Sequence, residues 1–213
     1  MSRERPILFN APMVRAILDG RKTQTRRVVK QKHLPWLANI LGNFLDGKWN
    51  QRPLPYGQPG DRLWVRETHA QVFEVDILAG RPVGPIGTAG SPARPEWKSR
   101  YVYLADGEMP NVQWHHVGDS QPVRWTPSIH MPRSASRITL EIVSVRVERL
   151  QDISEADAKA EGAEPYRLPV HPARESIRHV DGFCALWTSI NGPGSWDANP
   201  WVWVVEFKRV TPP

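Results

Sequence analysis

The sequence has one cysteine, Cys184, among 213 residues. A lone thiol excludes an intramolecular disulfide framework and a zinc site built on cysteines. Long apolar runs are also missing, because no segment approaches the roughly 18 apolar residues of a membrane-spanning helix. The charged N-terminal residues are followed only by a broken apolar stretch, so a signal peptide is not indicated. We therefore expect a cytoplasmic protein with no membrane partner.

Acidic residues are in deficit: there are 22 of them against 28 lysines and arginines, which gives a formal net charge of +6. Arginine supplies 21 of the 28 basic residues. Its planar guanidinium suits phosphates and carboxylates and stacks on bases. Ten tryptophans add possible stacking surfaces. RNA or a nucleotide is therefore one expected partner, although a charge of this size does not require one.

The segment 10–29 has the pattern of a short amphipathic helix followed by a strand. Asn10 is a typical N-cap and Gly20 a typical residue after the helix end. The period then becomes two, so Thr25 and Arg27 share one strand face. Lys22 can approach Thr25 only if it still belongs to the turn. This combination indicates either a reactive centre or a basic edge strand exposed to solvent.

Three further segments are expected to be strands, and the shortest of them is 100–105. In 62–68, Leu63 and Val65 mark an inward face that also includes Glu67, and a buried carboxylate is costly unless it is paired. In 136–150 the apolar residues change parity midway, and a bulge or sharp bend near Ile142 reconciles the two halves. Such bends are frequent in barrel strands.

The C-terminal third alternates between helix and strand patterns. Ser154 and Asp157 form a capping signal for a short helix that ends at Gly162, and a second helix covers 183–190. A final strand is expected at 201–210. Bent strands, few helices and long loops predict an α+β fold, a small bent β-barrel with short flanking helices. We expect a single domain over 1–213, with insertions at about 30–55, 70–135 and 163–180.

The residues Gly20, Lys22, Thr25 and Arg27 together resemble the signature of the ASCH domain, a PUA-like β-barrel family. Three other stretches resemble that family too: 59–65, 150–161 and 204–208. The Thr form of the signature is similar to that of 4-N-acetylcytidine amidohydrolases. With its stretches 127–133 and 196–201, the whole chain resembles longer ASCH-domain proteins of temperate phages. ASCH domains are also proposed to bind or cut RNA. The core resemblance covers about 100 of the 213 residues.

The resemblance implies a metal-independent amidohydrolase that removes acyl groups from the exocyclic nitrogen of cytosine nucleosides or bases, with no cofactor. It implies Lys22, Thr25 and Glu161 as the catalytic residues. Further candidates, for substrate binding or a secondary role, are Arg27, Glu67, Arg21, Trp64, His130, Arg133, Trp125 and Trp196. The histidines 115, 116 and 130 match no metal-ligand spacing, so no metal site is expected.

Glu161 stands out without the family, because it lies in the last turn of its helix, where the dipole disfavours an anion, and four residues after Asp157. Lys22 is the expected compensating cation. Either Lys22 or Glu161 is then the base for a Thr25 nucleophile. The alternative function is an RNA- or nucleotide-binding module of phage origin, or a ribonuclease. It relies on a basic stretch that also includes residues 21, 26, 30 and 32.

Overall fold

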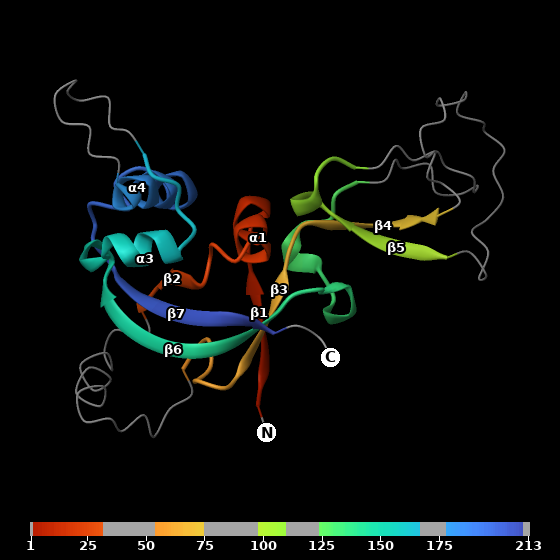
Figure 1. The fold of residues 1–213 in the computed structure, drawn as a ribbon, viewed down its shortest axis with the longest axis horizontal. Coiled ribbons are helices and arrows are strands. Elements are labelled where there is room, and N and C mark those ends of the chain that lie inside the picture. Colours follow the sequence, from red (N-terminus) through yellow and green to blue (C-terminus); the bar gives the residue numbers. More distant parts are fainter. Residues whose placement is uncertain (1, 32–53, 75–97, 110–123, 167–177, 211–213) are drawn as a thin grey trace. The chain divides into compact units, whose positions relative to one another are not determined.

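The computed structural model describes residues 2–31, 54–74, 98–109, 124–166 and 178–210 (Figure 1). In these ranges the chain has two sheets and few helices, which confirms the α+β prediction. Its backbone forms two compact units. The first unit is Met1–Arg5, Ala16–Leu63 and Ile138–Pro213, and the second unit is Pro6–Arg15 and Trp64–Arg137. Within the described ranges, every helix is too short or too polar to cross a membrane.

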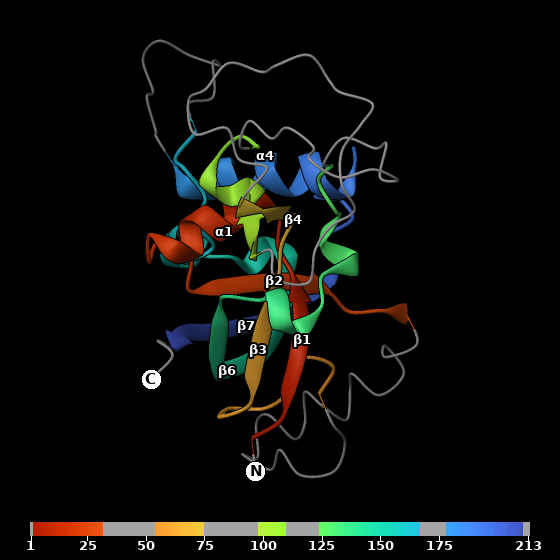
Figure 2. The ribbon, with the colours of Figure 1, turned by 90° about the vertical axis from the view of Figure 1, so that its right-hand side faces the viewer.

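The larger sheet has five strands, and Figure 2 shows β3 between β1 and β6. The strand order is β1 (Glu4–Leu8), β3 (Arg62–Arg66), β6 (Thr139–Arg149), β7 (Trp201–Val210) and β2 (Gln24–Val28). The strands β6 and β7 pair antiparallel, and β2 pairs antiparallel with the other side of β7. Because β1 and β2 are the two edges of this order, the described strands do not close into the expected barrel.

The bend predicted near Ile142 is a bulge in β6. The pairing of β6 with β7 shifts register between Ile142 and Ser144, and Val143 is 50% exposed between them. Leu140 and Ile142 are buried on one side of the shift and Val145 on the other. The extra residue reverses which parity points inward, and this explains the change of parity in the sequence.

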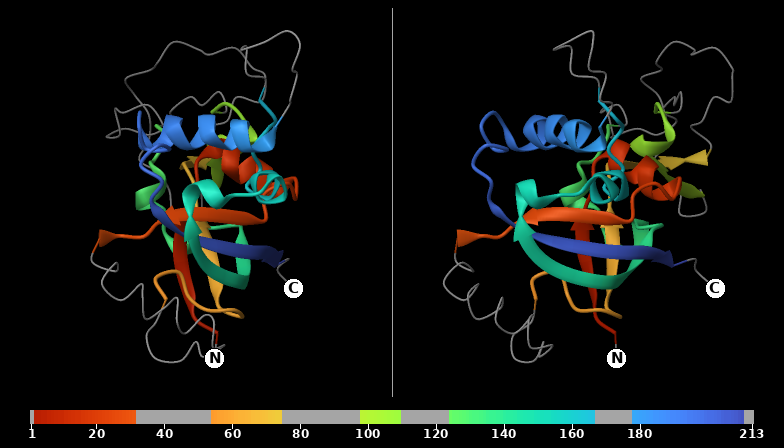
Figure 3. Two further views of the ribbon diagram at one scale, coloured as in Figure 1. Left: turned by 90° about the vertical axis from the view of Figure 1, so that its left-hand side faces the viewer. Right: turned by 60° about the vertical axis from the view of Figure 1, so that its left-hand side comes forward.

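Two helices cover one face of β7 and β2 in the first unit (Figure 3). They are α3 (Glu155–Ala160) and α4 (His179–Asn191), and α4 begins four residues before the predicted start. The predicted cap of α3 is present, because the Asp157 amide donates to Ser154 Oγ at 3.1 Å. The apolar core between helices and strands consists of Leu150, Ile153, Ala158, Ala163, Phe183, Trp187, Val202 and Val204.

The helix α1 (Ala11–Leu18) has the predicted boundaries. At its start the Met13 amide donates to Asn10 Oδ1 at 3.0 Å. At its end the Gly20 amide donates to the Ile17 carbonyl, and Gly20 has φ = +75°, a conformation that residues with a Cβ rarely adopt. The chain then turns into β2.

In the second unit, β4 (His69–Phe73) pairs antiparallel with β5 (Ser99–Tyr103). The strand near 100–105 was predicted, whereas β1 and β4 were not. Three short 3-10 helices follow: η3 (Leu104–Asp106), η4 (Ser128–His130) and η5 (Arg133–Ala135).

Candidate active site

Lys22 and Glu161 form a buried ion pair in the first unit. Lys22 Nζ donates to Glu161 Oε2 at 2.6 Å and to the Glu161 carbonyl oxygen at 2.8 Å. The two side chains are 0% and 3% exposed. Lys22 is therefore the compensating cation that the position of Glu161 required. The assignment of catalytic roles to these residues stays a prediction.

Backbone contacts bring the two residues together. Lys22 and Glu161 form an isolated antiparallel bridge, and the Thr23 amide donates to the Ala160 carbonyl at 2.8 Å. Gly162 follows with φ = +76°, and a Cβ at this position would lie 3.1 Å from Lys22 Cβ. The approach of the α3 end to the turn after α1 therefore requires glycine at 162.

Burial lowers the pKa of Lys22 below its ordinary value of 10.5. The Glu161 carboxylate opposes this shift, while the positive charges of Arg27 and then Arg26 support it. The net direction is downward, so this amine gives up its proton more readily than an exposed lysine does. A lysine of this kind is suited to act as a base.

Thr25 is buried on β2, opposite Val205 of β7. Alternation along the strand gives Thr25 and Arg27 the same face, while Arg26 points to the other face. Lys22 lies between α1 and β2 and binds Glu161. Arg26 binds the same carboxylate from the face of β2 opposite to that of Thr25. Thr25 as the nucleophile stays a prediction.

Arg26 is wholly buried, with a side chain 0% exposed. Its Nη1 donates to Glu161 Oε1 at 3.2 Å, its Nε donates to Glu148 Oε1 at 3.1 Å, and its Nη2 lies 3.4 Å from Asp157 Oδ2. The guanidinium carbon lies 5.7 Å from the centre of the Phe183 ring. The prediction that Arg26 belongs to a solvent-facing basic stretch is wrong, because three carboxylates compensate its charge in the interior.

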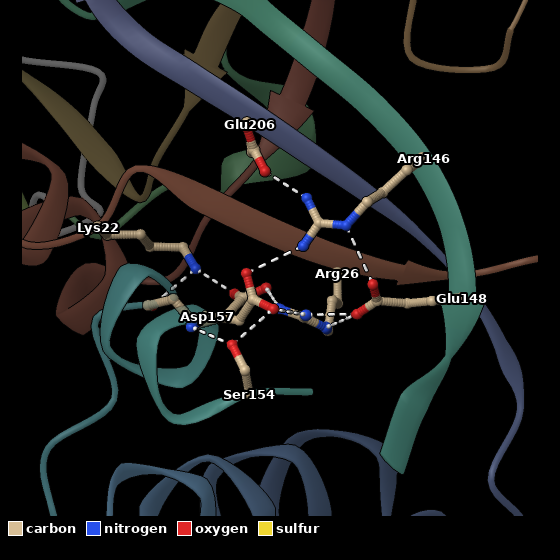
Figure 4. A network of polar contacts seen from close by, with 8 residues as sticks. Lys22, Arg26, Arg146, Glu148, Ser154, Asp157 and Glu206 are labelled. Carbon is tan, nitrogen blue, oxygen red and sulfur yellow. Dashed lines mark hydrogen bonds and ion pairs between the residues drawn. The ribbon is translucent and has the colours of Figure 1, made fainter. Parts of the chain in front are cut away.

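Arg146 extends the network outward from β6 (Figure 4). It donates to Glu148 Oε2 at 3.0 Å, to Asp157 Oδ1 at 2.9 Å and to Glu206. Burial tends to raise the pKa of Asp157, but the Ser154 hydroxyl, Arg146 and Arg26 outweigh it, and the pKa is lowered overall. The alternating charges thus keep Asp157 ionised beside Arg26.

No motif predicted the network that Arg26 and Arg146 form with Glu148, Asp157 and Glu161, but the sequence contained a signal for it. Asp157 and Glu161 lie four residues apart, on one face of a short helix, and two neighbouring carboxylates require cations. Arg26 has the strand parity opposite to Thr25, which places it on the other face of β2. Only the pairing of β2, β7 and β6 determines that this face meets the end of α3.

Glu67 lies in the second unit and is 1% exposed, which confirms its predicted place on the inner face. Arg137 pairs with it through two hydrogen bonds, Nε to Oε1 at 2.9 Å and Nη2 to Oε2 at 3.1 Å. Arg137 also donates to both Asp106 oxygens at 2.7 Å. Burial raises the pKa of Glu67 above its ordinary value of 4.5, although Arg137 opposes the shift.

The remaining candidates have varied surroundings. Arg21 is exposed and pairs with Glu164 at 2.6 Å and Asp19 at 3.1 Å. Trp64, in the second unit, is half-buried, with the guanidinium carbons of Arg66 and Arg133 at 5.5 and 5.9 Å from its ring centre.

The other candidates for substrate binding or a secondary role differ in solvent exposure. His130 and Arg133 are exposed, while Trp125 and Trp196 are half-buried. Residues 32, 115 and 116 lie outside the described ranges. Among the described residues, no three His, Cys, Asp or Glu side chains gather as metal ligands would. No family model, curated protein or solved structure matches this chain.

Proposed function

We propose that the protein is a metal-independent amidohydrolase that removes acyl groups from the exocyclic nitrogen of cytosine nucleosides or bases. The observation that carries the proposal is the buried Lys22–Glu161 pair, with Nζ 2.6 Å from Oε2, three residues before the buried Thr25. An acyl-transfer site needs a base for its nucleophile, and Lys22 and Thr25 supply these two groups in the proposed site.

In the proposed reaction Thr25 Oγ1 attacks the acyl carbon and gives its proton to Lys22. The tetrahedral intermediate collapses when the carbon–nitrogen bond breaks, and Lys22 returns the proton to the exocyclic nitrogen of cytosine. Water then hydrolyses the threonine ester and releases the carboxylic acid. Glu161 accepts two hydrogen bonds from Lys22 and orients its amine. The lowered pKa of Lys22 favours it over Glu161 as the base.

For the finer fold we propose one ASCH-like, PUA-like domain over 1–213 that carries the three predicted insertions. The turn from α1 into β2 supports this, because the four signature residues lie there with Lys22 directed at Glu161. The bulged β6 paired with β7 is a second supporting feature. The assay with 4-N-acetylcytidine, which measures catalysis, is a further test of the family assignment.

Among the predicted substrate-binding residues, Arg27 has the strongest support. It shares the face of Thr25, and burial lowers its pKa while Tyr56 and Glu161 act against this shift. Arg21 is exposed next to the turn and is a candidate for the outer part of the site. Glu67 is left out of the proposed machinery, because Arg137 occupies both of its oxygens, and Trp64 belongs with the alternative function.

The test is incubation with 4-N-acetylcytidine while the absorbance change that accompanies cytidine formation is followed. We expect Lys22→Ala and Thr25→Ala to abolish turnover. Thr23→Ala and Lys208→Ala are matched controls, because both replaced side chains are exposed, and they should keep the wild-type rate. Failure of the wild-type protein to release cytidine would overturn the proposal. Near-full activity of Thr25→Ala would replace the threonine ester with direct attack by water.

The alternative is an RNA- or nucleotide-binding module. Two arginines with cation–π contacts to Trp64, one of them the exposed Arg133, favour it, since guanidinium and indole surfaces together suit phosphates and bases. Against it, Arg66 also donates to the carbonyl oxygens of Met131 and Ile129, which gives it a structural role. Burial of Arg26 also removes one cation from the basic stretch.

A further inference from the structure

Arg26 binds carboxylates that come from two different elements. Glu148 belongs to β6, whereas Asp157 and Glu161 belong to α3 and the residue that ends it. One guanidinium on β2 therefore connects the end of α3 to the strand layer. Figure 4 shows Arg26 between Glu148 and Asp157, with Lys22 entering from the other side of Asp157.

The two carboxylate oxygens of Glu161 have different partners. Oε1 accepts from Arg26 Nη1 at 3.2 Å and Oε2 accepts from Lys22 Nζ at 2.6 Å. We propose that Arg26 is a positioning residue, which holds Glu161 by Oε1 and so directs Oε2 at Lys22. Its effect on catalysis rests on the proposed function, whereas its effect on the Lys22–Glu161 pair does not.

The shape of the guanidinium matters as much as its charge. Arg26 reaches Glu161, Glu148 and Asp157 with three different nitrogens while its plane lies near the Phe183 ring. A lysine ammonium is a point charge on a flexible stem and cannot reproduce this fork. Arg26→Lys therefore keeps the charge and loses the geometry, while Arg26→Met loses both.

The positioning role predicts a change at Lys22. Among the described residues, the charged groups with the largest effect on the pKa of Lys22 are Glu161 from the end of α3, and Arg27 and Arg26 from β2. Loss of Arg26 removes a positive charge, and it also allows Glu161 to offer both oxygens to Lys22. Both changes favour the protonated ammonium, so the pKa of Lys22 rises.

The experiment follows the titration of lysine side chains by NMR in protein labelled with ¹³C and ¹⁵N at lysine. The signal that disappears in Lys22→Met identifies Lys22. We expect its midpoint to move to higher pH in Arg26→Met. Arg146→Met is the matched control, because Arg146 shares Glu148 and Asp157 with Arg26 but does not bond to Glu161 in the described network. An unmoved midpoint in Arg26→Met, or an equal shift in Arg146→Met, overturns the proposal.

A pH profile of deacylation gives the second readout. For Arg26→Met, the rise of kcat/KM with pH should move upward with Lys22, with about a tenfold loss at neutral pH for each pH unit. Activity should recover at alkaline pH, whereas a merely structural defect lowers the rate at every pH. Arg26→Lys should show a smaller shift of the same sign. If Arg26→Met does not fold, Arg26→Lys decides, and wild-type behaviour in both measurements overturns the positioning role.

The two proposals fail separately. A shifted Lys22 titration in a protein that does not hydrolyse 4-N-acetylcytidine overturns the proposed function and keeps the positioning role. Hydrolysis by a wild-type protein whose Lys22 titration is unaffected in Arg26→Met keeps the function and overturns the positioning role.

Discussion

Glu161 and Glu67 are both buried carboxylates held by basic residues, one in each unit, but their partners differ. Arg137 takes both oxygens of Glu67 and also binds Asp106, which is half exposed. Glu161 divides its oxygens between Arg26 and Lys22. A carboxylate that one guanidinium binds through both oxygens has no oxygen left for another strong partner. Glu161 instead binds a lysine whose pKa is lowered, and such a lysine releases a proton more readily. We therefore expect a structural role for Glu67, and the proposed function gives Glu161 a role in catalysis.

The largest expected difference between Glu161 and Glu67 is the effect of their substitution on the rate of deacylation. Glu161→Gln removes the carboxylate that orients the Lys22 amine, and we expect kcat/KM on 4-N-acetylcytidine to fall by about 100-fold, the order of loss when a catalytic group is misplaced. Glu67→Gln should lower kcat/KM much less, because Arg137 already occupies both oxygens of Glu67. The absorbance assay measures both. A larger loss in Glu67→Gln than in Glu161→Gln would reverse the assignment.

The loss of unfolding free energy should follow the opposite order, with the larger loss at the Glu67 pair than at the Glu161 pair. Arg137→Met leaves Glu67 in the interior without its two hydrogen bonds, and removal of one partner of a buried pair costs about 3 kcal/mol of unfolding free energy. Lys22→Met should cost less, because Arg26 still binds Glu161. Urea unfolding at pH 7 measures the difference. Lys208→Met, which breaks an exposed pair with Glu141, is the control and should cost under about 1 kcal/mol.

The two sites should also respond to pH with opposite signs. The folded state raises the pKa of Glu67 above 4.5, so unfolding free energy from this group is greatest below pH 4.5 and falls as pH rises through the folded pKa. The folded state lowers the pKa of Lys22 below 10.5, so unfolding free energy from this group rises with pH from the folded pKa to 10.5.

Urea unfolding across pH tests both signs. Glu67→Gln should flatten the decrease on the acidic side, and Lys22→Met should flatten the increase on the alkaline side. An alkaline increase that persists unchanged in Lys22→Met would show that Lys22 is not the group responsible, and it would contradict the direction of its pKa shift.

Local patterns predicted the elements around the candidate site because their causes are local. The Ser154 cap, the glycine after α1 and the reversed parity at Ile142 each depend on a few neighbouring residues. β1 and β4 were missed because their short strands carry no clear alternation. The described strands do not close into the predicted barrel, since strand bends indicate curvature but do not determine whether two edge strands meet.

One part of the candidate site, the pairing of Glu161 with a cation, could be predicted because its cause is also local. The need of Glu161 for a cation follows from its helix position, and Lys22 meets that need. The role of Arg26 was predicted wrongly, because charge alone suggested a surface residue. Its burial depends on Glu148, Asp157 and Glu161, which are between 122 and 135 residues away in the chain.

The smallest effect on activity is expected from substitution of the exposed residues in the basic stretch. With Arg26 buried, the described cations still exposed there are Arg21 and Lys30, and Arg21 already pairs with Asp19 and Glu164. A nucleoside substrate has no phosphate for them to bind. We therefore expect Arg21→Gln combined with Lys30→Gln to leave kcat/KM nearly unchanged, and fluorescence anisotropy to detect no RNA binding near physiological salt. Micromolar RNA binding with a salt slope that falls by about one unit for each lost cation would instead favour the binding module. If such a protein also released no cytidine from its acetylated form, the Lys22–Glu161 pair would be structural, like Glu67 and Arg137.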